Sequence, residues 1–144
     1  MAGYFLREVD GVAYADALRR LNALEPRFPP LEDQHLEHGH WWLGHDCDER
    51  IIGFAGLVPF VPFVLVGYLK RALVLPPHRG QGLQRLFLAV REAKARSLGW
   101  TMLVTECVGD NLHSQQNLER AGYARCVPEQ RWGEPGSVYF VKTL

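Results

Sequence analysis

Hydrophobic and polar residues follow two different periods along the chain. Apolar residues recur at helical spacing over residues 12–24, 82–97 and 111–121, and a proline or glycine follows each of these segments. A shorter helix is expected over residues 31–38. Segments rich in β-forming residues predict strands over residues 4–9, 40–45, 50–58, 64–75, 101–107, 125–132 and 137–143. The predicted order is β-α-α-β-β-β-α-β-α-β-β, which is typical of a layered α/β fold.

The segment from Leu69 to Leu86 joins a predicted strand to the longest predicted helix through a glycine loop. Pro76 and Pro77 end the strand because they lack the amide hydrogen that a sheet requires. Gly80 and Gly82 allow a tight turn and a close approach of another molecule to the backbone. The first N–H groups of a helix are free, and they lie at the positive end of its dipole. The segment therefore predicts an anion site suited to phosphate.

Periodicity also predicts which side chains of this helix are buried. We expect the buried face to hold Leu83, Leu86, Phe87 and Val90. Glu92 and Arg96 have the spacing of an ion pair, which we expect on the outer face.

Two adjacent tryptophans lie on the strand predicted over residues 40–45. Successive strand residues face opposite sides of a sheet, so Trp41 and Trp42 should point in opposite directions. We expect one of them to enter the core and the other to form an exposed apolar patch with Phe60 and Phe63. Such a patch is usually a subunit interface or a pocket wall, which makes a homodimer a further prediction.

Composition limits the class of protein. The 144 residues favour a single domain spanning 1–144, and 47% hydrophobic with 22% charged residues is ordinary for a folded domain. Sixteen basic and sixteen acidic residues give no net charge, which argues against a nucleic-acid partner. The longest apolar run contains prolines and is too short to span a bilayer, so no membrane partner is expected. Three cysteines without CxxC spacing favour a reducing, cytoplasmic compartment.

Two motifs resemble those of a known family. The glycine loop lacks the Gly-Lys-Ser/Thr ending of a Walker loop and the GxGxxG spacing of a dinucleotide fingerprint. Residues 74–83, VLPPHRGQGL, instead resemble the acetyl-coenzyme A loop of the GNAT superfamily of N-acetyltransferases, whose pattern is Arg/Gln-x-x-Gly-x-Gly/Ala. Residues 111–123, NLHSQQNLERAGY, resemble the second segment of that family, which is an Asn at a strand end, a helix, and then Gly-Phe/Tyr.

The resemblance implies a fold and a set of coenzyme contacts. The GNAT fold has a mixed, mostly antiparallel sheet of about six or seven strands, helices on both faces, and a splayed strand pair that holds the pantetheine arm. The backbone of Ala72, Leu73 and Val74 would bind the pantetheine, and Arg79 and Arg85 would contact phosphate. The pyrophosphate would lie on the backbone N–H groups of Gly80, Gln81, Gly82, Leu83, Gln84 and Arg85. Further coenzyme contacts or helix caps are expected at Asn111, Ser114 and Asn117.

The resemblance also implies acetyl transfer from the co-substrate acetyl-coenzyme A to a primary amine, by direct attack in a ternary complex. Something must accept a proton from the amine. Glu106, beside the splayed gap, is the first candidate for the base, and Tyr68 is the second. The acceptor is an unidentified small-molecule or peptide amine.

One departure from the family pattern leaves an alternative open. Many members carry a Tyr as general acid at the position of Leu118, which cannot donate a proton. Ser114, Asn117 or Tyr123 would have to replace it, or water would protonate the thiolate. The alternative is a non-catalytic acyl-coenzyme A sensor or interaction module.

The histidines between His35 and His45 do not have the spacing of a zinc site, and no metal is expected. The resemblance places this region beside the acceptor pocket. There Glu32, Asp33 and Glu37 would suit a cationic amine.

Overall fold

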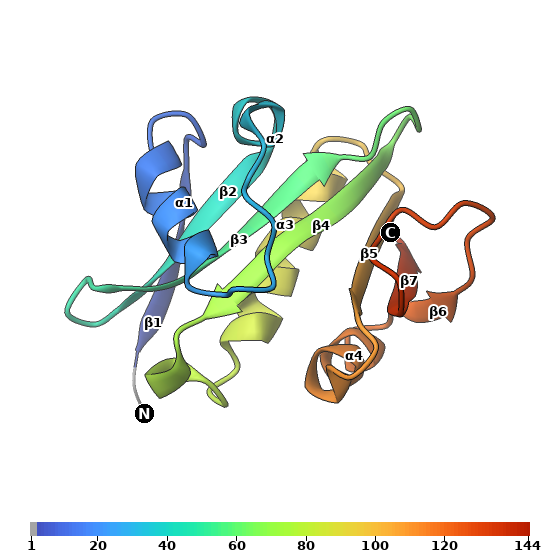
Figure 1. The fold of residues 1–144 in the computed structure, drawn as a ribbon. Helices are drawn as coiled ribbons and strands as arrows, with labels where there is room; N and C mark the ends of the chain where they lie inside the picture. Colours follow the sequence, from blue (N-terminus) through green and yellow to red (C-terminus); the bar gives the residue numbers. More distant parts are fainter. Residues whose placement is uncertain (1–2) are drawn as a thin grey trace.

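The computed structural model describes residues 3–144 and confirms the predicted order of elements. A seven-stranded sheet has the strand order β1-β2-β3-β4-β5-β7-β6 (Figure 1). Its strands are β1 (Tyr4–Val9), β2 (His40–Asp46), β3 (Ile51–Pro59), β4 (Val66–Val74), β5 (Met102–Val108), β6 (Ala124–Cys126) and β7 (Ser137–Thr143). The helices are α1 (Ala15–Ala23), α2 (Asp33–His38), α3 (Leu83–Ser97), α4 (Leu112–Arg120) and a 3-10 turn, η1 (Pro76–His78).

The sheet is mixed and mostly antiparallel, as expected. Every neighbouring pair of strands is antiparallel except β4 and β5. Helices α1 and α2 lie over one face, against β3 and β4, and α3 crosses the opposite face (Figure 1). The fold therefore has the helix–sheet–helix layers that bury both faces of the central strands.

Each face of the sheet has its own hydrophobic cluster. The cluster on the α1 and α2 side contains Leu18, Trp41 and Phe54, and the cluster on the α3 side contains Trp42 and Phe87. The two tryptophans do face opposite ways, but both are buried. The prediction that one of them is exposed is wrong, because helices cover both faces of β2.

Helix α3 is rotated from the predicted orientation. Leu83 and Phe87 are buried as expected, but Leu86 is 43% exposed, and the buried face continues through Arg91 and Glu92. Glu92 is therefore not on the outer face. Its carboxylate accepts from the Tyr123 hydroxyl and from Lys142 Nζ, both at 2.9 Å, which compensates its burial.

Two element boundaries differ from the prediction for local reasons. Helix α1 begins at Ala15 rather than at residue 12, because Asp10 Oδ1 accepts from the backbone N–H groups of Val12 and Ala13 and forms a turn there. Strand β6 ends at Cys126 rather than at residue 132. The chain from 127 to 136 is a loop that contains two prolines.

Candidate active site

Strands β4 and β5 are neighbours only over their first residues. Val66–Tyr68 pairs with Met102–Val104, and Thr105 Oγ1 then donates to the carbonyl of Leu69 at 3.2 Å. Beyond this point, within residues 3–144, β4 pairs only with β3 and β5 pairs only with β7. The strands diverge and leave one backbone edge of β4 unpaired, which is the splayed gap that was expected.

Alternation along β4 identifies the backbone groups that face this gap. The Leu75 N–H donates to Ile52 on β3 at 2.8 Å, so Leu73 also faces β3, whereas Ala72 and Val74 face the gap. Arg79 Nε already donates to the carbonyl of Val74 at 2.9 Å. The backbone groups left for a ligand strand are therefore the N–H and C=O of Ala72 and the N–H of Val74.

A bulge lies directly before these residues. The register of β3 and β4 shifts between Ala55 and Gly56, and Arg71 has a left-handed φ of 59°. The buried side chain of Arg91, from α3, donates to the carbonyls of Arg71 (3.1 Å) and Gly56 (3.2 Å). Its burial lowers the pKa of Arg91 from 12.5 to about 10. Arg91 thus fixes the bulge from the α3 face of the sheet, opposite to the face that α1 and α2 cover.

The glycine loop offers a set of free donors. Gly80 and Gly82 have φ of 77° and 84°, and a Cβ on either residue would meet no atom within 4 Å. Gly82 is the N-cap of α3, and no side chain of residues 3–144 caps this end. Within the described part of the chain, the backbone N–H groups of residues 80–85 have no hydrogen-bond acceptor. The loop has the open, left-handed geometry of an anion cradle.

The two arginines of the loop differ in their surroundings. The Arg79 guanidinium bonds the Val74 carbonyl and so closes the end of β4, in addition to any role toward phosphate. Arg85 is exposed at the first turn of α3, and Gln84 beside it is half-buried. Both Arg85 and the outer edge of the Arg79 side chain can still meet an anion at the loop.

Asn111, one of the expected coenzyme contacts, is the N-cap of α4. Asn111 Oδ1 accepts from the Ser114 N–H at 3.2 Å, which is an N-cap bond. Leu118 is buried in the core, and Tyr123 is bound to Glu92 on the α3 side of the sheet. Ser114 and Asn117 are half-buried. Of the residues considered as general acid in place of Leu118, Tyr123 already donates its hydroxyl hydrogen to Glu92, which leaves Ser114 and Asn117.

Glu106 and Tyr68 meet at the closed end of the gap. The Tyr68 hydroxyl donates to Glu106 Oε1, and the other oxygen, Oε2, is buried without a hydrogen-bond partner among residues 3–144. Burial raises the pKa of Glu106 above 4.5, while the hydrogen bond from Tyr68 opposes the rise. Burial and the adjacent Glu106 carboxylate raise the pKa of Tyr68 as well. Tyr68 is therefore a neutral donor at physiological pH, and Glu106 is the group that can accept a proton.

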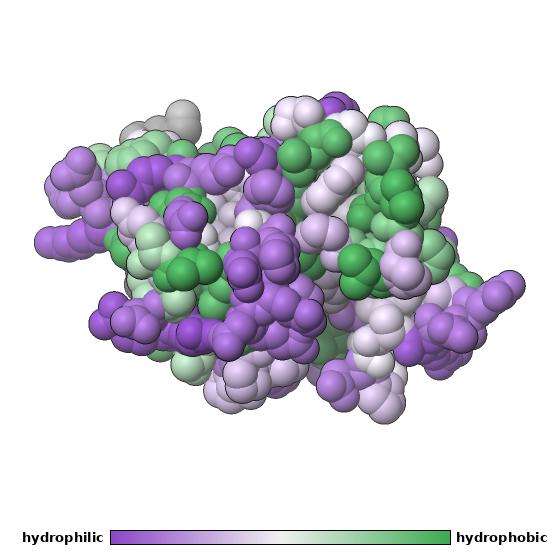
Figure 2. Space-filling view, turned by 90° about the horizontal axis from the view of Figure 1, so that it is seen from above, coloured by the Kyte–Doolittle hydropathy of each residue, from purple (hydrophilic) through white to green (hydrophobic). Residues whose placement is uncertain are grey.

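Aromatic rings surround this pair. Phe60 stacks on Tyr68 (5.9 Å between ring centroids) and contacts Trp132 edge-on (5.1 Å). Trp132 comes from the β6–β7 loop, which packs so closely here that a Cβ on Gly133 would overlap Glu106 Oε2. The adjoining β3–β4 loop exposes Phe63, and the view from above shows hydrophobic residues gathered on the half of the molecule that holds this loop (Figure 2).

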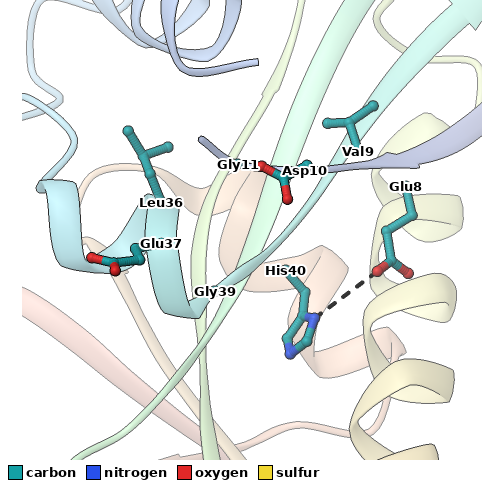
Figure 3. Close-up of a pocket in the computed structure, with 8 residues that line it drawn as sticks. All are labelled: Glu8, Val9, Asp10, Gly11, Leu36, Glu37, Gly39 and His40. Atoms are coloured by element: carbon teal, nitrogen blue, oxygen red, sulfur yellow. Dashed lines mark ion pairs between the residues drawn. The ribbon is translucent and has the colours of Figure 1, made fainter. Parts of the chain in front are cut away.

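A second hollow of about 360 Å³ lies where β1, α2 and β2 meet (Figure 3). Its polar groups already have structural partners. Glu8 pairs with Lys94 at 3.1 Å and lies 3.9 Å from His40, and Asp10 forms the turn before α1. Within residues 3–144 no group of three His, Cys, Asp or Glu side chains is arranged to hold a metal ion. Of the acidic residues expected near the acceptor, Glu37 borders this hollow and Glu32 and Asp33 do not. Neither Glu106 nor Tyr68 lines it, so the hollow is separate from the Glu106 site.

The comparisons with known proteins agree with this geometry. The family model described as "Acetyltransferase (GNAT) family" matches residues 11–123. The chain belongs to the GNAT acetyltransferase family. No curated protein sequence matched significantly.

Solved GNAT structures share the whole fold. An acetyltransferase of the GNAT family from Staphylococcus aureus superposes with a TM-score of 0.79 at 12% identity, covering 98% of this chain and 99% of that one. The yncA structure from Salmonella typhimurium, which contains its cofactor acetyl-CoA, gives 0.76 at 16% identity and covers 98% and 94%. A Klebsiella pneumoniae chain named as an acyl-CoA N-acyltransferase gives 0.69 at 26% identity and covers 98% and 97%.

Sequence reasoning missed three residues that the structure places at this candidate site. Arg91 lies four residues after Phe87, on the buried stripe of α3, and this position was the available signal for a buried cation. Lys70 and Trp132 gave no comparable signal, because β4 and the β6–β7 loop meet only in three dimensions. None of the helices in the described residues is long and apolar enough to cross a membrane.

Proposed function

We propose that this acetyltransferase transfers the acetyl group of acetyl-coenzyme A to the nitrogen of a primary amine by direct attack in a ternary complex. The proposal is carried by one observation: a carboxylate with an unpartnered oxygen lies where β4 and β5 separate. The acyl group of a coenzyme whose arm lies in the gap would reach this point. An amine that enters from the α1 and α2 face would meet it there.

Glu106 accepts, through a water molecule, the proton that the attacking nitrogen loses. Its raised pKa makes it a better base than an exposed carboxylate. Tyr68 donates to Oε1 and so orients the carboxylate, whereas Oε2 has no hydrogen-bond partner among residues 3–144 but is buried against Gly133, so the proton reaches it through a water molecule. The C–S bond breaks as the amide forms, and the leaving thiolate takes a proton from water, since Leu118 has none to give.

Backbone groups hold the coenzyme in this proposal. The N–H and C=O of Ala72 and the N–H of Val74 pair with the pantetheine amides, and the N–H groups of residues 80–85 hold the pyrophosphate. The bulge at Arg71 is the point where β4 turns away from β5, and it sets the position of Ala72 relative to the acyl group.

A sensor that binds acyl-coenzyme A without turnover is the second candidate. It is favoured by Leu118, which is buried where many relatives carry an acid. A single experiment separates the two functions. The protein is incubated with acetyl-coenzyme A and a panel of primary amines while free thiol and acetylated amine are measured.

Direct transfer predicts thiol and acetylated amine in equal amounts, and loss of both with Glu106→Gln. Calorimetric binding of coenzyme A without turnover of any amine would support the sensor instead. Absence of coenzyme binding would refute both functions, and a stabilisation of the folded protein at millimolar coenzyme is a second readout of that binding.

A further inference from the structure

Two adjacent cations lie on the acceptor side of the gap without a carboxylate partner. Within residues 3–144, neither Lys70 nor Arg71 forms an ion pair. The Arg71 guanidinium donates to the side-chain oxygen of Asn22 and to the carbonyl of Pro29, both at 3.0 Å. Both acceptors are neutral, so these hydrogen bonds do not neutralise the charge of Arg71. Lys70 has no such hydrogen bonds in the described chain, and its Nζ lies 5.7 Å from the centre of the Tyr68 ring.

Lys70 is placed beside the proposed chemistry rather than beside the pyrophosphate loop. It shares the α1 and α2 face of β4 with Tyr68, whose hydroxyl donates to Glu106. Burial, followed by the charge of Arg71, lowers the pKa of Lys70. The carboxylates of Glu32 and Glu106 offset this effect only in part, since neither forms an ion pair with Lys70 within residues 3–144, and an anionic group on a bound molecule would offset the remaining cost.

An apolar wall adjoins the same point. Phe60 stacks between Tyr68 and Phe63, with 5.5 Å between the centroids of Phe60 and Phe63, and Trp132 closes the edge of the stack. Phe63 is 60% exposed, so the wall opens toward solvent. The site thus presents a proton acceptor, a cation and an aromatic surface next to one another.

We propose that the acceptor is a free α-amino acid with a large apolar side chain. Its amine lies at Glu106, its carboxylate on Lys70, and its side chain against Phe63, the exposed ring of the aromatic stack. This inference rests on the proposed acetyl transfer and narrows its acceptor. An α-amino acid carries its nitrogen and carboxylate on one carbon, which matches a base and a cation that flank the same tyrosine. A peptide N-terminus lacks the free carboxylate and would leave Lys70 without a partner.

The test compares L-phenylalanine with L-phenylalaninamide, which differ only in the carboxylate. The amide has the less basic amine, so simple reactivity favours the amide whereas the Lys70 subsite favours the acid. We expect kcat/KM for phenylalanine to be higher by about 10- to 100-fold, the range for one hydrogen bond to a charged group. In Lys70→Met this advantage should disappear, mainly through a rise in KM for phenylalanine.

Lys94→Met is the matched control, because Lys94 pairs with Glu8 away from the gap and should leave the preference unchanged. An equal loss with both compounds in Lys70→Met would overturn the subsite, because it would assign Lys70 to the thioester oxygen or to structure. A preference of the wild-type protein for the amide would overturn it as well. Equal kcat/KM for glycine and phenylalanine would overturn the role of the aromatic wall.

Calorimetry keeps the two proposals distinguishable. The titrant is phenylalanine and the protein is saturated with coenzyme A, so no turnover occurs. Binding that Lys70→Met weakens by about tenfold or more supports the subsite even if no amine is acetylated, in which case only the transfer proposal fails. Acetylation of simple amines without any phenylalanine binding refutes the subsite and leaves transfer standing.

Discussion

Replacement of Arg91 by methionine should impair coenzyme binding more than it impairs folding. The guanidinium is only 3% exposed and donates to two bulge carbonyls, those of Gly56 and Arg71. Its third bond, from Nε to the carbonyl of Phe87 at 3.0 Å, is less critical, because a helix interior already supplies that carbonyl with a backbone donor. Methionine fills much of the volume and removes every donor.

Two opposing effects set the change in the free energy of unfolding. Each buried carbonyl that loses its partner costs about 1–3 kcal/mol, so the pair costs about 2–6 kcal/mol. Against this, the pKa of Arg91 falls from 12.5 to about 10, and at about 1.4 kcal/mol per pKa unit the removal of the buried charge returns about 3.5 kcal/mol. The net destabilisation should therefore not exceed about 2.5 kcal/mol.

The bulge itself should respond more strongly. Arg71 holds a left-handed φ of 59°, which costs about 1–2 kcal/mol for a residue with a side chain. Without Arg91 this strain can relax, and the relaxation moves Ala72 and Val74 relative to β5. We expect the dissociation constant of coenzyme A to rise at least about tenfold.

The assay combines urea unfolding, followed by tryptophan fluorescence, with calorimetry of coenzyme A binding. Arg96→Met is the matched control on the same helix. The Arg96 side chain is 53% exposed, and its one carboxylate partner among residues 3–144, Glu92, lies 3.9 Å away. A destabilisation above about 4 kcal/mol together with unchanged coenzyme affinity would refute the reasoning. That result would assign Arg91 to the core alone.

Four further predictions concern the loop and the base. Gly82→Val should lower the affinity for coenzyme A at least about tenfold by calorimetry, because a φ of 84° strains a branched residue and the new side chain enters the cradle. Gly99→Val is the control, since Gly99 has a φ of 78° and equal space around its Cβ. Equal coenzyme affinities of the two variants would exclude the loop from coenzyme binding. The wild-type rate should fall in acid as Glu106 is protonated, and the low residual rate of Glu106→Gln should not show that fall. In Glu134→Gln, which removes a charge that raises the pKa of Glu106, the fall should remain but occur at lower pH. Because the pKa of Glu106 is raised on folding, the folded state keeps a proton that the unfolded state has lost, and the wild-type protein loses stability as pH rises through that pKa. The difference in free energy of unfolding between wild type and Glu106→Gln should therefore be constant below pH 4.5 and change by pH 8. A difference that does not vary with pH would contradict the raised pKa. Gly133→Ala should reduce the turnover rate because the new Cβ displaces Glu106 Oε2, and full activity would show that the β6–β7 loop yields without moving the base.

Local sequence signals were sufficient for the order of elements and for the glycine loop. Two prolines, a glycine pair and a helix pattern lie within a few residues of one another, so their meaning does not depend on distant packing. The pairing of Glu106 with Tyr68 joins residues 38 apart in sequence, and alternation on a single strand does not reveal it.

The orientation of α3 shows what periodicity misses. A face chosen from apolar residues alone includes Leu86 and excludes Arg91 and Glu92, yet the structure buries both charged residues. Each has partners from another element: the bulge carbonyls for Arg91, and Tyr123 with Lys142 for Glu92. Burial of a charge depends on such distant partners, which a one-dimensional pattern does not contain.

The short junction between β4 and β5 has a consequence for proteolytic stability. Within residues 3–144, the backbone ladder between β4 and β5 is only three residue pairs long, extended by the bonds from Thr101 N–H to Leu65 and from Thr105 Oγ1 to Leu69. A coenzyme that pairs with Ala72 and Val74 would supply the missing edge contacts, so saturation at 100 times the dissociation constant would stabilise the folded state by about 2.7 kcal/mol. Amide hydrogens of residues 102–108 would then exchange more slowly when coenzyme is abundant, and the lifetime of the protein in a cell would follow the supply of its own substrate.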